Sequence, residues 1–216
     1  MKAIVVAGGD AAPDDAALLS GADLLIAADS GAEWLYNQGR APDVLVGDFD
    51  SIDAGLLERL TAQGVAIERH DADKDASDAE LALARAVSDG ADEVVLLGGI
   101  GGDRLDHELA NLLLLADSRW ARVDLRIARG RTTARVVRDG GEAGLQGAPG
   151  DLVTLLPIGG DASGVTTRGL RWPLLGEILA FGQARGLSNE IDQAPASVSL
   201  ERGTLLVIET RKEPRS

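Results

Sequence analysis

The sequence predicts an N-terminal α/β domain with a doubly wound, mostly parallel sheet, followed by a C-terminal all-β domain of sandwich or barrel type. In the first part of the chain, short apolar runs alternate with segments of helical length, the pattern of a parallel sheet covered by helices on both faces. After about residue 122, short β-type runs are separated by Gly, Pro and Asp. We therefore expect two domains, 1–125 and 126–216.

Five buried strands are expected in the first domain because five short runs are rich in Val, Ile, Leu and Ala. These runs occupy residues 3–8, 24–29, 44–48, 65–69 and 93–99. Between them, helices are expected at 30–39, 52–64 and 77–90. The last of these begins with Ser77 and Glu80 at the spacing of a capping box.

A fourth helix is expected to begin near Asp103, and its residues divide into two stripes. Leu105, Leu109 and Leu112 share one face at spacings of four and three, so we expect them to pack. A separate polar stripe is formed by Arg104, His107 and Asn111. The histidine alone would more often be an ordinary interfacial residue.

Composition limits the partners of the chain. Its 216 residues, 45% of them hydrophobic, are enough to bury a core, and 35 acidic against 21 basic side chains give a net charge of -14. That charge argues against binding to nucleic acid or to anionic lipid. No cysteine is present, no run approaches the ~20 apolar residues of a spanning helix, and the opening apolar run is shorter than that of a signal peptide. We expect a cytoplasmic protein.

Carboxylates follow consecutive expected strands. Asp29 ends the second run, the stretch "VGDFDSI" places Asp48 and Asp50 after the third, and Asp73 and Asp75 follow the fourth. If the chain stays extended, the side chains of Asp48 and Asp50 point to the same side. Each Asp alone can equally cap a helix or start a turn. Together, at the edge where such sheets bind ligands, they indicate a hard cation such as Mg²⁺ and a phosphate-bearing substrate.

The fifth run leads into "GGIGGDRLDH", a glycine-rich turn before a helix. Gly98, Gly99, Gly101 and Gly102 would let the backbone approach a phosphate group. The segment is not a P-loop, because no GxxxxGK[ST] occurs. Arg104 and Lys74 could neutralise phosphate oxygens, or each could form a structural ion pair.

The motifs "GDFDSI", "DKDASDAELAL", "GGIGGDRLDHELANLLLL", "TRGLRW" and "GLSNE" together resemble the thiamine pyrophosphokinase family, nearly from end to end. The resemblance implies an N-terminal domain that binds ATP with Mg²⁺. It also implies a C-terminal β-domain that completes a thiamine pocket at the interface of a homodimer. The reaction would transfer a pyrophosphoryl group from ATP to the thiamine hydroxyl, giving thiamine diphosphate and AMP.

Site residues are carried over by position. The resemblance implies that the metal and the pyrophosphoryl group are bound by Asp48 and Asp50, joined by Asp75 or Asp78 and by Asp106, with Arg104 touching phosphate. Taken with the glycine turn and the polar stripe, the candidate nucleotide contacts are Asp29, Lys74, Gly101, Gly102, Arg104, His107 and Asn111. The candidate thiamine contacts are Trp172, Ser188 and Asn189.

Trp172 is a candidate on chemical grounds as well, because thiamine is a cation and a tryptophan face can bind its thiazolium ring. The alternative is ordinary packing in the β-domain.

Two other functions stay open. One is a haloacid-dehalogenase-like phosphatase, although the acidic pair follows the third strand and is not continued as DxDx[TV]. The other is a non-catalytic nucleotide-binding regulatory module.

Overall fold

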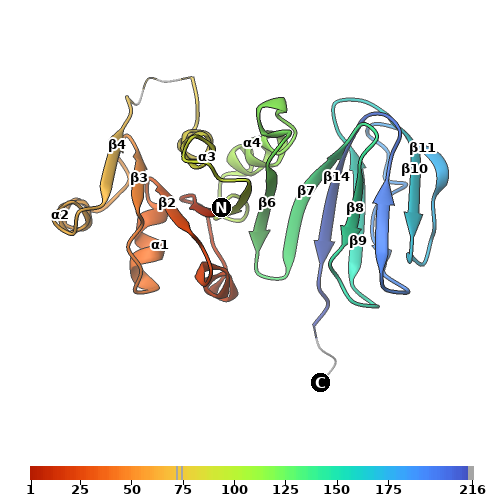
Figure 1. Ribbon diagram of the computed structural model, residues 1–216, viewed down its shortest axis with the longest axis horizontal. Helices are drawn as coiled ribbons and strands as arrows, with labels where there is room; N and C mark the ends of the chain where they lie inside the picture. The colour runs from red at the N-terminus through yellow and green to blue at the C-terminus, as the bar shows by residue number, and fades with distance from the viewer. Residues whose placement is uncertain (72, 74, 214–216) are drawn as a thin grey trace. The chain divides into compact units, whose positions relative to one another are not determined.

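The computed structural model describes residues 1–71, 73 and 75–213. The chain divides into two compact units, Met1–Gly130 and Arg131–Ser216. Figure 1 labels their elements in chain order.

The first unit is built on a parallel sheet in the order β4-β3-β2-β1-β5-β6. Its strands are β1 (Lys2–Val6), β2 (Leu24–Ala28), β3 (Val44–Gly47), β4 (Ala66–Arg69), β5 (Glu93–Leu97) and β6 (Asp124–Arg129). Strand β1 pairs with both β2 and β5, so the chain order reverses there. In sheets of this kind ligands bind beyond the carboxyl ends of the strands at such a reversal.

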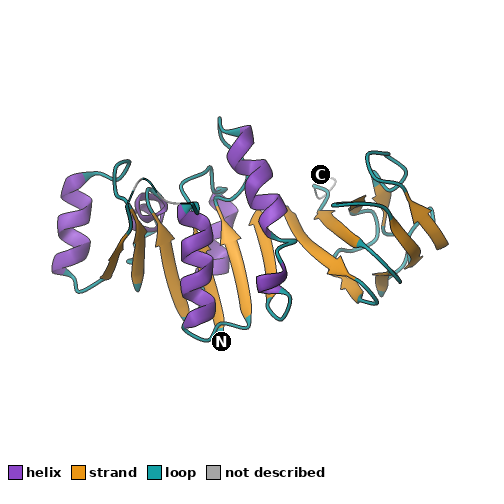
Figure 2. Cartoon of the chain, turned by 90° about the horizontal axis from the view of Figure 1, so that it is seen from above, coloured by secondary structure: helices purple, strands orange, loops and turns teal. Residues whose placement is uncertain are grey.

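Helices cover both faces of this sheet, as Figure 2 shows. They are α1 (Gly31–Asn37), α2 (Ala54–Ala62), α3 (Asp78–Ser88) and α4 (Leu105–Leu114), with two short 3₁₀ segments, η1 (Pro13–Leu19) and η2 (Ser118–Trp120). Because side chains alternate along a strand, Ile4 and Val6 face one way and join Leu35 of α1 and Leu60 of α2 in one core cluster. Helix α3 packs against β1, β2 and β3.

Strand β6 extends the parallel sheet, although the sequence predicted that residues beyond 125 belong to the β-domain. Its pairing with β5 is parallel throughout, from Glu93 opposite Asp124 to Leu97 opposite Ala128. The composition of β6 does not distinguish a sixth parallel strand from the first strand of an antiparallel domain, so only the pairing assigns it.

The expected start of α3 forms with one change. The backbone N–H of Glu80 donates to Oγ of Ser77 at 3.2 Å, as in a capping box. The Glu80 carboxylate instead accepts from Nη2 of Arg119 at 2.6 Å, which ties α3 to η2.

The prediction that Leu105, Leu109 and Leu112 of α4 pack was wrong for the first two, and Leu112 is half-buried. Leu105, Leu109 and Leu113 are 68%, 51% and 60% exposed, and spacings of four residues place them on one face of the helix. Asn111, which the sequence placed in the polar stripe, is the buried residue of this helix. The other two residues of that stripe, Arg104 and His107, are exposed, so the stripe is not buried as a whole.

The second unit is an antiparallel β-sandwich. Its first sheet has the order β7-β14-β9-β12, formed by β7 (Thr132–Arg138), β14 (Thr204–Thr210), β9 (Leu152–Pro157) and β12 (Asn189–Glu190). Its second sheet has the order β11-β10-β13-β8, formed by β11 (Leu175–Leu179), β10 (Ala162–Arg168), β13 (Ala196–Ser199) and β8 (Glu142–Leu145). Val153, Val207, Val165 and Val198 share the core between them. The predicted fold class, α/β followed by a β-rich region, is confirmed.

Within the described residues, no helix has both the length and the apolar character needed to cross a membrane.

Two leucines at the C-terminal end of α4 offer a test of the burial pattern. Leu115, at its C-cap, is 1% exposed, so Leu115→Ala should lower the free energy of unfolding by about 2 to 5 kcal/mol. Leu113→Ala, the same change at an exposed position, should change it by less than about 0.5 kcal/mol. Urea denaturation at low protein concentration measures both. A large cost at Leu113 under these conditions would show that this face packs within the chain.

Candidate active site

A cavity of about 860 Å³ opens beyond the carboxyl ends of the parallel strands in the first unit. The loops after β1, β2, β3 and β5 line it, together with the N-terminal parts of α3 and α4. Predicted site residues on its wall are Asp29, Asp48, Asp78, Gly101, Gly102, Arg104, His107 and Asn111. The fold therefore gathers residues from four separate parts of the sequence at one edge of the sheet.

Three carboxylates of this region form a cluster that could hold a metal ion. Asp29, Asp48 and Asp50 each offer an oxygen, and these oxygens lie within 4.8 Å of one another. Oδ2 of Asp29 accepts a hydrogen bond from Oγ of Ser51, whereas its Oδ1 is buried and has no partner among the described residues. An unpaired buried carboxylate oxygen is costly unless a donor or cation completes it. The donor set is all oxygen, which suits Mg²⁺.

The pKa of Asp29 is raised, first because burial penalises the charged carboxylate. The neighbouring carboxylates of Asp78, Asp48 and Asp50 raise it further, and the Ser51 hydrogen bond acts in the opposite direction. A cation within the cluster would relieve both effects.

The acidic pair is brought together by a kink and not by an extended strand. Strand β3 ends at Gly47, and Phe49 has a positive φ of 67°, which is unusual for a bulky residue. Oδ1 of Asp48 accepts from the backbone N–H of Asp50 at 3.1 Å. The segment is therefore not extended, as the sequence analysis assumed, although the carboxylates of Asp48 and Asp50 do lie close together.

Arg69, at the end of β4, contacts the residues of this kink. Its Nη1 donates to the backbone carbonyl of Asp48 at 2.8 Å, and its guanidinium lies 4.6 Å from the centre of the Phe49 ring. Phe49 is itself buried in the core cluster of the first unit. Arg69 thus contacts both the backbone of Asp48 and the ring of Phe49, and these two residues set the direction of the Asp48 carboxylate.

Two glycine-containing loops meet beside the acids. A Cβ on Gly9, in the loop after β1, would lie 2.3 Å from the carbonyl oxygen of Gly98, and a Cβ on Gly98 would lie 2.4 Å from that of Ala7. Only residues without a side chain allow this approach. The backbone N–H of Gly9 donates to the Gly98 carbonyl at 3.0 Å, so the two loops form one wall of the cavity.

Asn111 anchors this wall. Its Nδ2 donates to the carbonyl oxygen of Gly99 at 2.8 Å, and the side chain is buried. The residue predicted to contact nucleotide therefore uses its amide N–H to fix the glycine-rich turn.

At the start of α4, Arg104 and Asp106 pair with each other. Nε and Nη2 of Arg104 donate to the two carboxylate oxygens of Asp106 at 2.9 and 2.7 Å. This two-point contact holds the pKa of Asp106 well below its usual range. Arg104 lines the cavity, but Asp106 lies outside the three-carboxylate cluster.

The remaining predicted acids, Asp75 and Asp78, differ in their relation to the cavity. Asp78 is on the cavity wall, whereas the exposed Asp75 belongs neither to the wall nor to the cluster. Lys74, a predicted nucleotide contact, lies outside the described residues.

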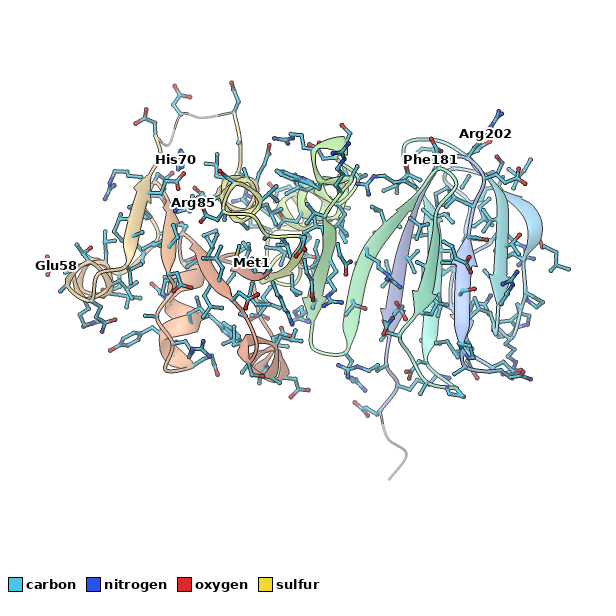
Figure 3. The ribbon with its side chains drawn as sticks, viewed as in Figure 1. Met1, Glu58, His70, Arg85, Phe181 and Arg202 are labelled. Atoms are coloured by element: carbon cyan, nitrogen blue, oxygen red, sulfur yellow. The ribbon has the colours of Figure 1, made fainter. Side chains whose placement is uncertain are left out.

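Strand β4 and helix α3 are joined by an ion pair. Glu68 of β4 accepts from Nη1 of Arg85 of α3 at 2.7 Å and lies 3.0 Å from Nε2 of His70; Figure 3 labels Arg85 and His70.

In the second unit, Asn189 lies against Trp172, and Ser188 directly precedes Asn189 in the chain. Trp172 is 50% exposed, Ser188 is exposed with a positive φ of 56°, and Asn189 is buried. Both backbone polar groups of Trp172 bond to the Asn189 side chain.

Comparison with known proteins agrees with this geometry. The family "Thiamin pyrophosphokinase, catalytic domain" matches residues 16–127, and "Thiamin pyrophosphokinase, vitamin B1 binding domain" matches residues 143–205. The chain belongs to the thiamine pyrophosphokinase family. It therefore combines the catalytic domain of an ATP-dependent kinase with a vitamin-B1-binding domain, and the predicted transfer of a pyrophosphoryl group from ATP to thiamine is confirmed.

Individual thiamine pyrophosphokinases match along nearly the whole chain. The enzyme from Bacillus subtilis is 28% identical over 211 residues, which cover 96% of this chain and 98% of that protein. A crystal structure of thiamine pyrophosphokinase from the same species superposes with a TM-score of 0.88 at 25% identity and covers 99% of this chain and 100% of the other. A structure of the Geobacillus thermodenitrificans protein gives a TM-score of 0.85 at 26% identity, with 99% of each chain covered. The family decides against the dehalogenase-like phosphatase and the non-catalytic module.

Sequence reasoning missed Gly8, Gly9, Asp10 and Ser51, which also line the cavity. The first three follow β1 directly, and a Gly-Gly pair at a strand end was the available signal. The sequence analysis also placed Asp29 beside the nucleotide and did not group it with Asp48 and Asp50. The two segments are joined only by the parallel pairing of β2 with β3.

Removing the contact behind the acidic kink tests its role. Arg69→Ala deletes one hydrogen bond and one ring contact, so we expect the Mg²⁺ concentration for half-maximal activity to rise about threefold to tenfold. Turnover at saturating Mg²⁺ should change much less. Arg59→Ala is the matched control, because Arg59 stacks on Tyr36 at 5.3 Å, outside the cavity wall. Equal shifts in both variants would remove Arg69 from the site.

Proposed function

We propose that Asp29, Asp48 and Asp50 hold Mg²⁺ at the cavity, and that ATP binds there with its phosphates against the glycine wall. The observation that carries this proposal is the three-carboxylate cluster with its unpartnered Asp29 oxygen. When bound, Mg²⁺ neutralises negative charge on the phosphate oxygens of the substrate. Mg²⁺ is usually held by one or two carboxylates together with substrate phosphates, so part of this cluster and the phosphates would share the ion.

The reaction needs charge neutralisation and alignment more than covalent chemistry from the protein. The thiamine hydroxyl oxygen forms a bond to the β-phosphorus, the bond from that phosphorus to the oxygen bridging to the α-phosphate breaks, and the hydroxyl proton is lost. We propose that Arg104 and His107 face phosphate oxygens from the start of α4. Asp106 keeps the Arg104 guanidinium aligned through its two-point contact.

In the second unit, we propose that Trp172 and Ser188 contact thiamine. The Trp172 ring is half exposed, and a cationic thiazolium ring is attracted to such a face. Ser188 lies in the same region with its side chain exposed.

We also propose that the active protein is a homodimer whose thiamine pocket is completed by the second chain. The family resemblance suggests it, and exposed apolar side chains in both units support it. Helix α4 exposes three leucines on one face, and the second unit exposes Trp172, Leu175, Ile178, Phe181 and Leu187. Figure 3 shows Phe181 at one end of that unit. Groups of exposed apolar residues commonly mark protein interfaces.

Asp48→Asn and Asp50→Asn should each lower turnover at least about a hundredfold, because each removes a preorganised charged group. Folding should survive, since repulsion within the cluster falls. AMP formation, measured with and without thiamine at saturating Mg²⁺, reports the change. Asp14→Asn removes the same charge from an exposed position outside the cavity and should be near wild type. Near-normal turnover of both cluster variants would exclude the pair from the mechanism.

Mixing two impaired variants, assayed at limiting thiamine, tests the shared pocket. When Asp50→Asn and Trp172→Ala chains are co-refolded, random pairing in a symmetric dimer should restore about a quarter of wild-type activity, because half of the dimers are mixed and each mixed dimer keeps one intact site. Each variant refolded alone is the control. No recovery, with mixed dimers shown by differential tagging, would place each pocket within one chain.

A further inference from the structure

The side chain of Asn189 is directed at the backbone of Trp172. Its Oδ1 accepts the backbone N–H of Trp172 at 3.1 Å, and its Nδ2 donates to the carbonyl oxygen of the same residue at 2.6 Å. Oδ1 also accepts the N–H of Glu190 at 2.8 Å. An amide side chain offers two acceptor and two donor positions, so three of the four are used within the protein. Asn189 is 6% exposed, which leaves little of it for a ligand to reach.

Trp172 depends on this contact because it lies between strands β10 and β11. The neighbouring backbone is also held, with the N–H of Arg171 donating to the carbonyl of Glu190 at 2.9 Å and Leu170 bridging to Ile191. The segment 189–191 thus supports the segment 170–172 through hydrogen bonds, and the side chain of Asn189 makes those to Trp172.

One face of the Trp172 ring is already occupied. The Arg171 guanidinium lies over the ring, 5.0 Å from its centre, and its Nη1 is 3.8 Å from a carboxylate oxygen of Glu190. A second cation is therefore directed to the opposite face, and binding there depends on how well the ring is held.

We propose that Asn189 is a positioning residue, which affects thiamine binding only through Trp172 and does not touch thiamine. This proposal rests on the proposed role of Trp172, and it replaces the direct contact that the resemblance implied. Ser188, the exposed neighbour, stays a direct contact. The two adjacent residues of the "SNE" segment thus have different tasks.

A double-mutant cycle distinguishes the two roles, with calorimetric thiamine binding to the full chain as the measurement. Asn189→Ala should weaken binding about fivefold or more in wild type and by less than about twofold in the Trp172→Ala background. Ser188→Ala is the matched control and should weaken binding by a similar factor in both backgrounds. Losses at Asn189 that multiply with those of Trp172→Ala would overturn the proposal.

Asn189→Asp makes the two roles differ in sign. A negative side chain in direct contact would tighten binding of a cation. A positioning residue would lose its bond to the Trp172 carbonyl, so binding should weaken. Tighter binding in this variant would therefore overturn the proposal.

A ligand-free readout covers variants that bind too weakly to titrate. Fluorine NMR of protein carrying fluorotryptophan should show a shifted or broadened Trp172 signal in Asn189→Ala, with the signals of Trp34 and Trp120 unchanged. An unchanged Trp172 signal would overturn the positioning role, and so would equal changes at all three tryptophans, which would indicate a general loss of folding. Wild-type thiamine affinity in Trp172→Ala would instead contradict the proposed thiamine contact itself.

Discussion

The main constraint on the site is that three carboxylates, which repel one another, each have an oxygen within 4.8 Å of the other two. Carboxylates free to move would separate. Asp29 and Asp48 are held because they follow the adjacent parallel strands β2 and β3, which pair from Ile26 opposite Val44 to Ala28 opposite Val46. Burial and the neighbouring charges raise the pKa of Asp29, which records the cost of the arrangement. Such a cost is expected at a site built for a cation, because the positive charge of the ion would offset the repulsion between the carboxylates.

Most of the surrounding structure holds this arrangement in place. The backbone of Phe49 adopts an unusual conformation between the two acids, and its ring is kept by the core on one side and by Arg69 on the other. The opposite wall follows the same logic, since Asn111 fixes the turn at Gly99 and two glycine loops approach too closely for any side chain. At the proposed phosphate site, such a rigid backbone would keep its N–H groups directed before the substrate binds.

The second unit solves a different problem, because its proposed ligand is recognised by a ring and not by charge. A half-exposed tryptophan outside the strands would move freely, and the Asn189 side chain limits that movement by binding both backbone groups of Trp172. In both units, a buried asparagine thus binds the backbone of a loop that we propose faces a ligand.

The sequence by itself determined the α/β-then-β fold class, the family and the gathering of acidic residues after consecutive strands, because each of these follows from local composition and motif order. The tertiary structure decided the rest. It assigned β6 to the parallel sheet, exposed Leu105, Leu109 and Leu113 of α4, and joined Asp29 to Asp48 and Asp50. It also gave Asn111 and Asn189 backbone partners 12 and 17 residues away. A polar side chain near a ligand site has the same local signature whether it binds the ligand or supports the loop that does. Its hydrogen-bond partner decides between the two, and that partner is brought close only when distant segments pack together.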